Sequence, residues 1–184
     1  MDVNVEAIHA LLPQTQCTRC GFAGCRPYAE AIARGEARIN RCPPGGTETL
    51  NRLASLLDVE APPLDPECGV EGPPQLALID PSRCIGCARC LPPCPVDAIV
   101  GASRQLHVVL ESVCTGCELC IAPCPVDCIT LVPRVALRSP VAAPTAEDNL
   151  RRFSAHENRL VRREAERLAT LAERKRLAAE AARS

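Results

Sequence analysis

Aromatic residues and lysine are nearly absent from this chain of 184 residues. It contains no tryptophan, one tyrosine and two phenylalanines. Lys175 is its only lysine, which excludes a phosphate-binding Gly-Lys-Ser/Thr loop and a Schiff-base lysine in the body of the chain. With so few large apolar side chains, the chain buries only a thin conventional core. We therefore expect something besides apolar packing to hold the fold together.

Long hydrophobic runs are also missing. No stretch of 18 apolar residues occurs, so we expect no transmembrane helix. The first ten residues carry Asp2 and Glu6 without a basic region, so we expect no secretory signal. Cysteines in a chain that is not exported stay reduced, which disfavours a disulfide framework. The three histidines are isolated, so we assign no catalytic residue and no small-molecule substrate.

Cysteine, in contrast, is abundant, with 14 residues. Eight of them form two blocks of the pattern C-x2-C-x2-C-x3-C-P, which repeat at a spacing of 30 residues. This run is typical of bacterial two-cluster ferredoxins, in which the fourth cysteine of each block binds the other cluster. One predicted [4Fe-4S] ligand set is Cys84, Cys87, Cys90 and Cys124, and the other is Cys114, Cys117, Cys120 and Cys94.

Zinc is the alternative for these two blocks. Structural zinc is usually bound by two well-separated C-x2-C pairs. A third cysteine three residues further on, followed by Cys-Pro and present twice, fits zinc poorly. We therefore favour iron–sulfur clusters and keep a zinc-stabilised interaction module as the weaker alternative.

A separate set of four cysteines lies near the start of the chain, at Cys17, Cys20, Cys25 and Cys42. Four thiolates in a small cytosolic domain indicate a metal centre, but this spacing alone leaves zinc and a third cluster open. We expect a helix from Cys25 to about Gly35, with Pro27 in its first turn. Its N-terminus would direct amide dipoles at the centre and stabilise negative charge there.

These motifs carry a family resemblance. Residues 12–32 and 40–46, the two cysteine blocks, residues 94–102 and the pair Leu106-His107 resemble the RnfB (RsxB) family, which provides one subunit of the Rnf/Rsx membrane electron-transport complex. The resemblance covers about residues 3–137. It implies that the first site also holds a [4Fe-4S] cluster, giving three in all. It further implies single-electron relay in a complex that couples redox chemistry to ion translocation.

The resemblance also implies partners and a location. We expect a redox-protein donor and acceptor, among them other Rnf-type subunits, and no nucleic acid. The family is usually tethered by an N-terminal transmembrane helix, whereas this sequence begins almost directly at the four-cysteine domain. The expected location is the cytoplasm, either free or attached peripherally to the cytoplasmic face of the inner membrane. The alternative function is a soluble polyferredoxin that donates electrons to another oxidoreductase.

The predicted fold class is α+β. We expect a four-cysteine domain (1–59), a proline-rich linker (60–75), a two-cluster ferredoxin domain (76–137), a second linker (138–145) and a charged helical tail (146–184). Apolar periodicity predicts helices at 3–12 and 47–57 and one long helix over 146–183. The expected strands are residues 76–79, 108–110 and 129–132.

The tail and three single residues remain open. The tail carries 10 basic and 7 acidic residues from position 145 on. It fits a solvated or self-associating helix, or a helix on a membrane surface or membrane subunit, better than a nucleic-acid ligand. We expect Cys68 to be a free thiol, and Cys128 to pack near a cluster in preference to binding it. His107 is expected to be an ordinary surface or strand residue in preference to a ligand.

Overall fold

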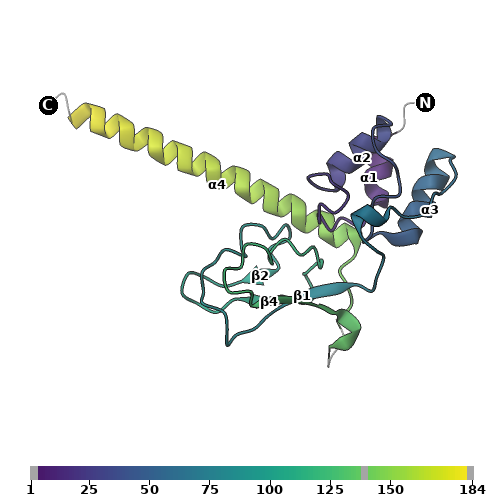
Figure 1. Cartoon of the computed structure of the whole chain (residues 1–184). Helices are drawn as coiled ribbons and strands as arrows, with labels where there is room; N and C mark the ends of the chain where they lie inside the picture. The colour runs from purple at the N-terminus through teal and green to yellow at the C-terminus, as the bar shows by residue number, and fades with distance from the viewer. Residues whose placement is uncertain (1–3, 138–140, 182–184) are drawn as a thin grey trace.

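The computed structural model describes residues 4–137 and 141–181 and shows two small units beside a long helix (Figure 1). The first unit contains α1 (Val5–Leu11), α2 (Cys25–Ala33) and α3 (Gly46–Leu57). The second contains β1 (Gln75–Ile79), β2 (Ile99–Val100), β3 (Val108–Val109) and β4 (Ile129–Pro133). The helix α4 (Ala146–Ala181) follows, and short 3-10 turns lie at Pro66–Cys68 and Arg134–Ala136. The predicted α+β class, with a long C-terminal helix, is confirmed.

The first unit packs its three helices around a small core. Ile8, Leu12, Tyr28 and Leu53 are fully buried there beside three of the cysteines. The Tyr28 hydroxyl donates to the Arg38 carbonyl at 2.8 Å and accepts from the Arg41 N–H at 3.1 Å. This single tyrosine therefore ties α2 to the loop that leads to Cys42.

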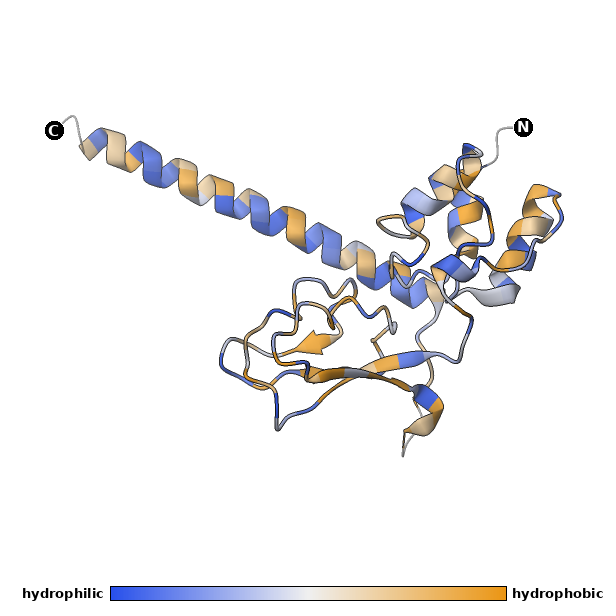
Figure 2. Ribbon diagram, in the orientation of Figure 1, coloured by the Kyte–Doolittle hydropathy of each residue, from blue (hydrophilic) through white to orange (hydrophobic). Residues whose placement is uncertain are grey.

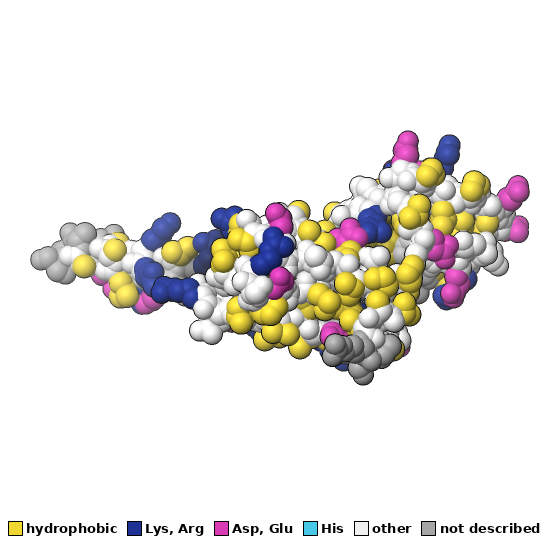
Figure 3. Space-filling view, turned by 60° about the horizontal axis from the view of Figure 1, so that its bottom comes forward, with side chains coloured by type: hydrophobic (Ala, Val, Ile, Leu, Met, Phe, Trp, Pro, Cys, Tyr) yellow, Lys and Arg dark blue, Asp and Glu magenta, His cyan; other side chains and the backbone are white. Residues whose placement is uncertain are grey.

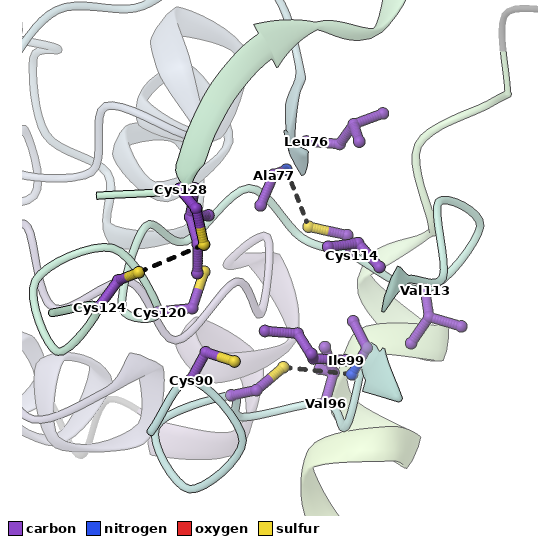
Figure 4. Packing of buried hydrophobic residues seen from close by; sticks show 14 residues of the cluster. Leu76, Ala77, Cys90, Val96, Ile99, Val113, Cys114, Cys120, Cys124 and Cys128 are labelled. Atoms are coloured by element: carbon purple, nitrogen blue, oxygen red, sulfur yellow. Dashed lines mark hydrogen bonds between the residues drawn. The ribbon is translucent and has the colours of Figure 1, made fainter. Parts of the chain in front are cut away.

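The second unit has very little regular structure. β1 pairs with β4 in antiparallel register, with Gln75 opposite Pro133 and Ile79 opposite Ile129, and β2 pairs with β3. The two-residue strand β2 is the one strand that the sequence patterns did not predict. Figure 4 shows that much of the core between these strands consists of cysteine side chains. Orange segments in Figure 2 mark the apolar strands β1 and β4.

The predicted linker over 60–75 lies along the first unit. The Asp65 N–H donates to the Asn40 carbonyl at 2.9 Å, and Glu71 accepts hydrogen bonds from the backbone and hydroxyl of Thr47. Cys68, expected as a free thiol, is buried. The segment is therefore attached to the first unit at several points.

The base of α4 contacts both units. Asn149 and His156 are buried, and the Asn149 amide donates to the Pro13 carbonyl at 3.1 Å. Beyond residue 159 every described position of α4 is exposed, and Figure 3 shows its Arg and Lys side chains spaced along the projecting part. No described helix is long and apolar enough to cross a membrane. Residues 138–140 of the second predicted linker and 182–184 of the predicted tail lie outside the described residues.

Candidate metal centres

The first four cysteines line one small cavity in the helical unit, together with Leu12, Tyr28 and neighbouring loop residues. Cys25 is the first residue of α2, as the sequence predicted, and Gly24 precedes it with φ of +152°. The Cys25 N–H donates to Gln16 Oε1 at 2.8 Å. A Cβ on Gly24 would lie 2.7 Å from that same oxygen, so only glycine allows this close approach.

Two glutamines hold the loop that carries Cys17. Gln14 and Gln16 are buried, and both have positive φ angles near 55°. Gln14 Nε2 donates to the His9 carbonyl at 2.6 Å, and Gln16 Nε2 donates to Gln14 Oε1 at 3.1 Å. These hydrogen bonds connect the end of α1 to the start of α2, and they offset the strain of two left-handed residues.

The eight thiols of the two repeat blocks line two further cavities in the second unit. Each cavity is lined by three cysteines of one block and the fourth cysteine of the other, which is the crossed grouping that the repeat predicted. One cavity contains Cys84, Cys87, Cys90 and Cys124. The other contains Cys114, Cys117, Cys120 and Cys94.

Backbone amides point at sulfur in the second of these cavities. The Ala98 N–H donates to Cys94 Sγ at 3.2 Å, and the Ala77 N–H donates to Cys114 Sγ at 3.5 Å (Figure 4). The Gly116 N–H also lies 3.5 Å from Cys114 Sγ, and Gly116 has φ of +69°. Such donors stabilise negative charge on sulfur, which is the charge that a thiolate ligand carries.

Burial strongly affects the acidity of these thiols. It raises the pKa of Cys25 and Cys117 to about 11, and that of Cys42 and Cys120 to about 12. Desolvation penalises the thiolate form, and neighbouring thiols add to this penalty. The metal-free protein therefore keeps these four groups protonated at neutral pH, and metal binding must release their protons.

A larger cavity of about 430 Å³ separates the two units, and both Cys17 and Cys114 line it. Arg19 forms an ion pair with Glu118 across it, and the Thr115 hydroxyl donates to the Thr15 carbonyl at 3.3 Å. These contacts place the four-cysteine cavity next to the cavity of Cys114.

The sequence did not predict that His107 is buried beside one of these cavities, whereas it did predict the packing of Cys128. His107, expected at the surface or in a strand, is 3% exposed, and its Nδ1 lies 3.7 Å from Cys84 Sγ. Cys128 is buried with its Sγ 3.5 Å from Cys124 Sγ, in agreement with the expected packing. Among the described residues, no three His, Cys, Asp or Glu side chains stand close enough to hold a single metal ion.

Comparison with known proteins identifies both cysteine regions. Residues 77–131 match the family described as 4Fe-4S dicluster domain, and residues 12–44 match the family described as "Putative Fe-S cluster". The chain is also similar to proteins named as the B subunit of the ion-translocating oxidoreductase complex. The relative from Alkalilimnicola ehrlichii is 63% identical over 101 residues, which are 54% of each chain. That from Thiobacillus denitrificans is 62% identical over 99 residues, 54% of this chain and 53% of the relative.

A third relative, from Azoarcus sp. BH72, is 60% identical over 103 residues, 56% of each chain. The chain therefore spans about half the length of the curated relatives it matches. Across the matched segment, this chain is similar to the B subunits of ion-translocating oxidoreductase complexes, which confirms the resemblance drawn from its cysteine motifs.

Proposed function

We propose that this chain relays single electrons through three [4Fe-4S] clusters, as the B subunit of an Rnf-like membrane complex that couples redox chemistry to ion translocation. The observation that carries the proposal is the presence of three separate cavities, each lined by the four thiols of one predicted ligand set, with Cys128 as an additional thiol at the Cys84 cavity. Four thiolates are the ligand set of a [4Fe-4S] cluster, and such a cluster, when bound, exchanges one electron at a time.

The proposed ligands follow from the cavities. Cys17, Cys20, Cys25 and Cys42 would hold the first cluster. Cys84, Cys87, Cys90 and Cys124 would hold the second, and Cys114, Cys117, Cys120 and Cys94 the third. The surrounding chain would supply amide N–H groups to sulfur, apolar burial and fixed spacing, and these are the factors by which a protein adjusts cluster potential.

The arrangement also suggests an order for the three sites. The four-cysteine cavity and the Cys114 cavity adjoin one inter-unit space, whereas the Cys84 cavity does not line it. Cys87 of the Cys84 cavity is solvent-exposed. We therefore place the third cluster between the other two, with the second cluster at the end where a redox partner makes contact. We assign no catalytic residue, so the chain's role is transfer between partner proteins.

Metal analysis with spectroscopy tests the cluster part of this proposal. Anaerobically purified protein should contain roughly twelve irons and no stoichiometric zinc, as three cubanes require. Mössbauer spectra should show only [4Fe-4S] centres. The serine variant of Cys42 should lose about four irons, while the ferredoxin-type centres remain. Zinc in place of iron would refute the electron-transfer role and favour the interaction module.

Membership of a complex needs a separate experiment. Affinity purification of the tagged full chain from detergent-solubilised cells of its source should recover Rnf-type membrane subunits. Recovery of a different oxidoreductase alone would favour the free polyferredoxin. A chain cut before Ala146 serves as a matched bait, because it shows whether α4 contributes to this association.

A further inference from the structure

The internal repeat makes the two ferredoxin cavities nearly equivalent position by position. Val96 of one corresponds to Val126 of the other, and Ile99 corresponds to Ile129. The segments Gln75-Leu76-Ala77 and Gln105-Leu106-His107 align in the same way, 30 residues apart. Against this background, two substitutions stand out. His107 and Cys128 line the Cys84 cavity at the positions where Ala77 and Ala98 line the Cys114 cavity.

His107 directs a ring nitrogen at a proposed ligand. Its Nδ1 lies 3.7 Å from Cys84 Sγ, within the range of an N–H···S hydrogen bond. A thiolate only accepts, so a hydrogen bond to the bound form requires the proton on Nδ1. Nε2 is buried without a hydrogen-bond partner among the described residues, and a proton there would be an unsatisfied buried donor. The buried environment therefore favours the tautomer that donates to Cys84.

Packing fixes the orientation of this ring. A Cβ on Gly101 would lie 2.4 Å from His107 Cδ2, so the glycine backbone forms one wall against the imidazole. The ring is 3% exposed and cannot turn towards solvent without displacing that wall. The contact with Cys84 is thus a feature of the packed unit.

Cys128 supplies a second side-chain donor to the same site. Its Sγ lies 3.5 Å from Cys124 Sγ, and a thiol S–H is a weak hydrogen-bond donor (Figure 4). At the equivalent position of the other cavity, Ala98 offers only its backbone N–H to Cys94. The Cys84 cavity therefore has two side-chain donors that its repeat partner lacks.

The Cys114 cavity differs in the opposite sense. Thr115 replaces Ile85, and its hydroxyl, which donates to the Thr15 carbonyl of the first unit at 3.3 Å, is also within hydrogen-bonding reach of Cys117. Glu118 also lines this cavity and brings a carboxylate, which is paired with Arg19. A hydroxyl carries a single proton, so Thr115 supplies at most one side-chain donor against two at the Cys84 site, and the Glu118 carboxylate adds negative charge that disfavours the reduced state at the Cys114 site.

We propose that His107 and Cys128 are positioning residues that raise the reduction potential of the cluster held by Cys84, Cys87, Cys90 and Cys124 above that of its repeat partner. Hydrogen bonds to cluster sulfur stabilise the extra negative charge of the reduced state, so added donors raise the potential. An electron that reaches the ferredoxin unit then resides on the cluster next to the exposed Cys87. This inference rests on the proposed clusters.

Repeat-matched variants test the inference by EPR-monitored redox titration of the fully loaded chain. The variants His107→Ala and Cys128→Ala introduce the alanine that stands at the equivalent position of the other repeat, Ala77 or Ala98. Each should shift the higher of the two ferredoxin midpoint potentials towards the lower one and leave the lower one unchanged. His107→Asn keeps an N–H donor near the position of Nδ1, so it should retain more of the separation than His107→Ala. The reciprocal variant Ala98→Cys should raise the lower midpoint.

Several results would overturn the inference. These are identical ferredoxin midpoints in the unaltered chain, a shift of the lower midpoint in His107→Ala, or equal effects of the Ala and Asn variants. Iron content is measured for each variant, and if His107→Ala loads poorly, Cys128→Ala and Ala98→Cys decide the outcome. Absence of iron from the unaltered chain would instead refute the proposed function, so the two failures are distinguishable.

Discussion

Arg159 attaches the base of α4 to the second unit, and its removal should loosen that attachment. Its guanidinium contacts both carboxylate oxygens of Asp97, with Nη2 2.6 Å from Oδ1, and His156 Nδ1 lies 2.9 Å from the same oxygen. The Arg159 and Asp97 side chains are 28% and 39% exposed, so solvent screens the pair only partly. The variant Arg159→Ala removes a two-point, charge-assisted interaction at a half-buried site.

The expected magnitude lies between that of a surface pair and that of a buried one. Exposed pairs contribute up to about 1 kcal/mol, and hydrogen bonds to charged groups contribute roughly 1.5–3 kcal/mol. We therefore expect the local opening free energy of α4 to fall by about 1–2 kcal/mol, which corresponds to a roughly 5- to 30-fold increase in the open population. Asp97 keeps its contact with His156 in this variant, so the helix should remain partly docked.

Hydrogen exchange of the α4 amides between Asn149 and Arg159 measures this opening directly. Arg167→Ala is the matched control, because Arg167 pairs with Glu164 within the exposed part of the same helix. An exposed pair at this spacing contributes about 0.2–0.5 kcal/mol, so the control should accelerate exchange by less than about threefold. Equal acceleration in the two variants, or none in Arg159→Ala, would show that the Asp97 contact does not hold the helix.

Three further predictions follow from the packing and the pKa shifts. Leu53→Ala should lower the free energy of unfolding of the first unit by roughly 2–5 kcal/mol, measured by thermal unfolding, because Leu53 is fully buried. The control Leu56→Ala, at a residue 44% exposed, should lower it by less than about 1 kcal/mol. Similar decreases in the two variants would refute the assigned core. Burial raises the pKa of Cys42 and Cys120 to about 12, so iron binding to these thiols must release protons. In a competition with an iron chelator, the protein should therefore retain more iron at about pH 8.5 than at about pH 7. Iron retention that does not change with pH would contradict this. Burial alone would raise the pKa of Asp97, but the hydrogen bonds from Arg159 and His156 outweigh burial and lower this pKa below 3.8. The attachment of α4 should therefore persist at neutral pH and weaken only as the pH falls through the lowered pKa of Asp97. Hydrogen exchange of the metal-free chain as a function of pH would show this.

Local patterns in the sequence predicted most helices because the physical causes are local. α2 begins at Cys25 with Pro27 in its first turn, and Gly35 follows its end with φ of +72°. The helix expected with Thr47 as its N-cap instead begins at Gly46, with Gly45 at the N-cap position. The two-residue strand β2 was missed because Ile99–Val100 is followed at once by Gly101, whereas the equally short β3 lies in the apolar run Val108-Val109-Leu110.

The structure brings each predicted set of four cysteines to one cavity. Three of the four in each repeat block share a short loop, so their spacing alone brings them together. Spacing carries no information about what packs against the thiols from elsewhere in the fold. His107 reaches Cys84 across 23 residues, and Arg159 reaches Asp97 across 62. Reading the 30-residue repeat position by position would have exposed the exchange of Ala77 for His107, since the two share the same preceding Gln-Leu pair.

The contact between Asn149 and Pro13 joins residues 136 positions apart in the chain. During synthesis, α4 therefore leaves the ribosome only after both cysteine-bearing units have emerged. α4 adds its contacts last, once Asn149 reaches Pro13 and Arg159 reaches Asp97, after Arg19 of the first unit can already pair with Glu118 of the second. Under the proposed function, the helix that completes the chain therefore also reinforces the spacing of the two units, and that spacing is the gap that electrons would have to cross.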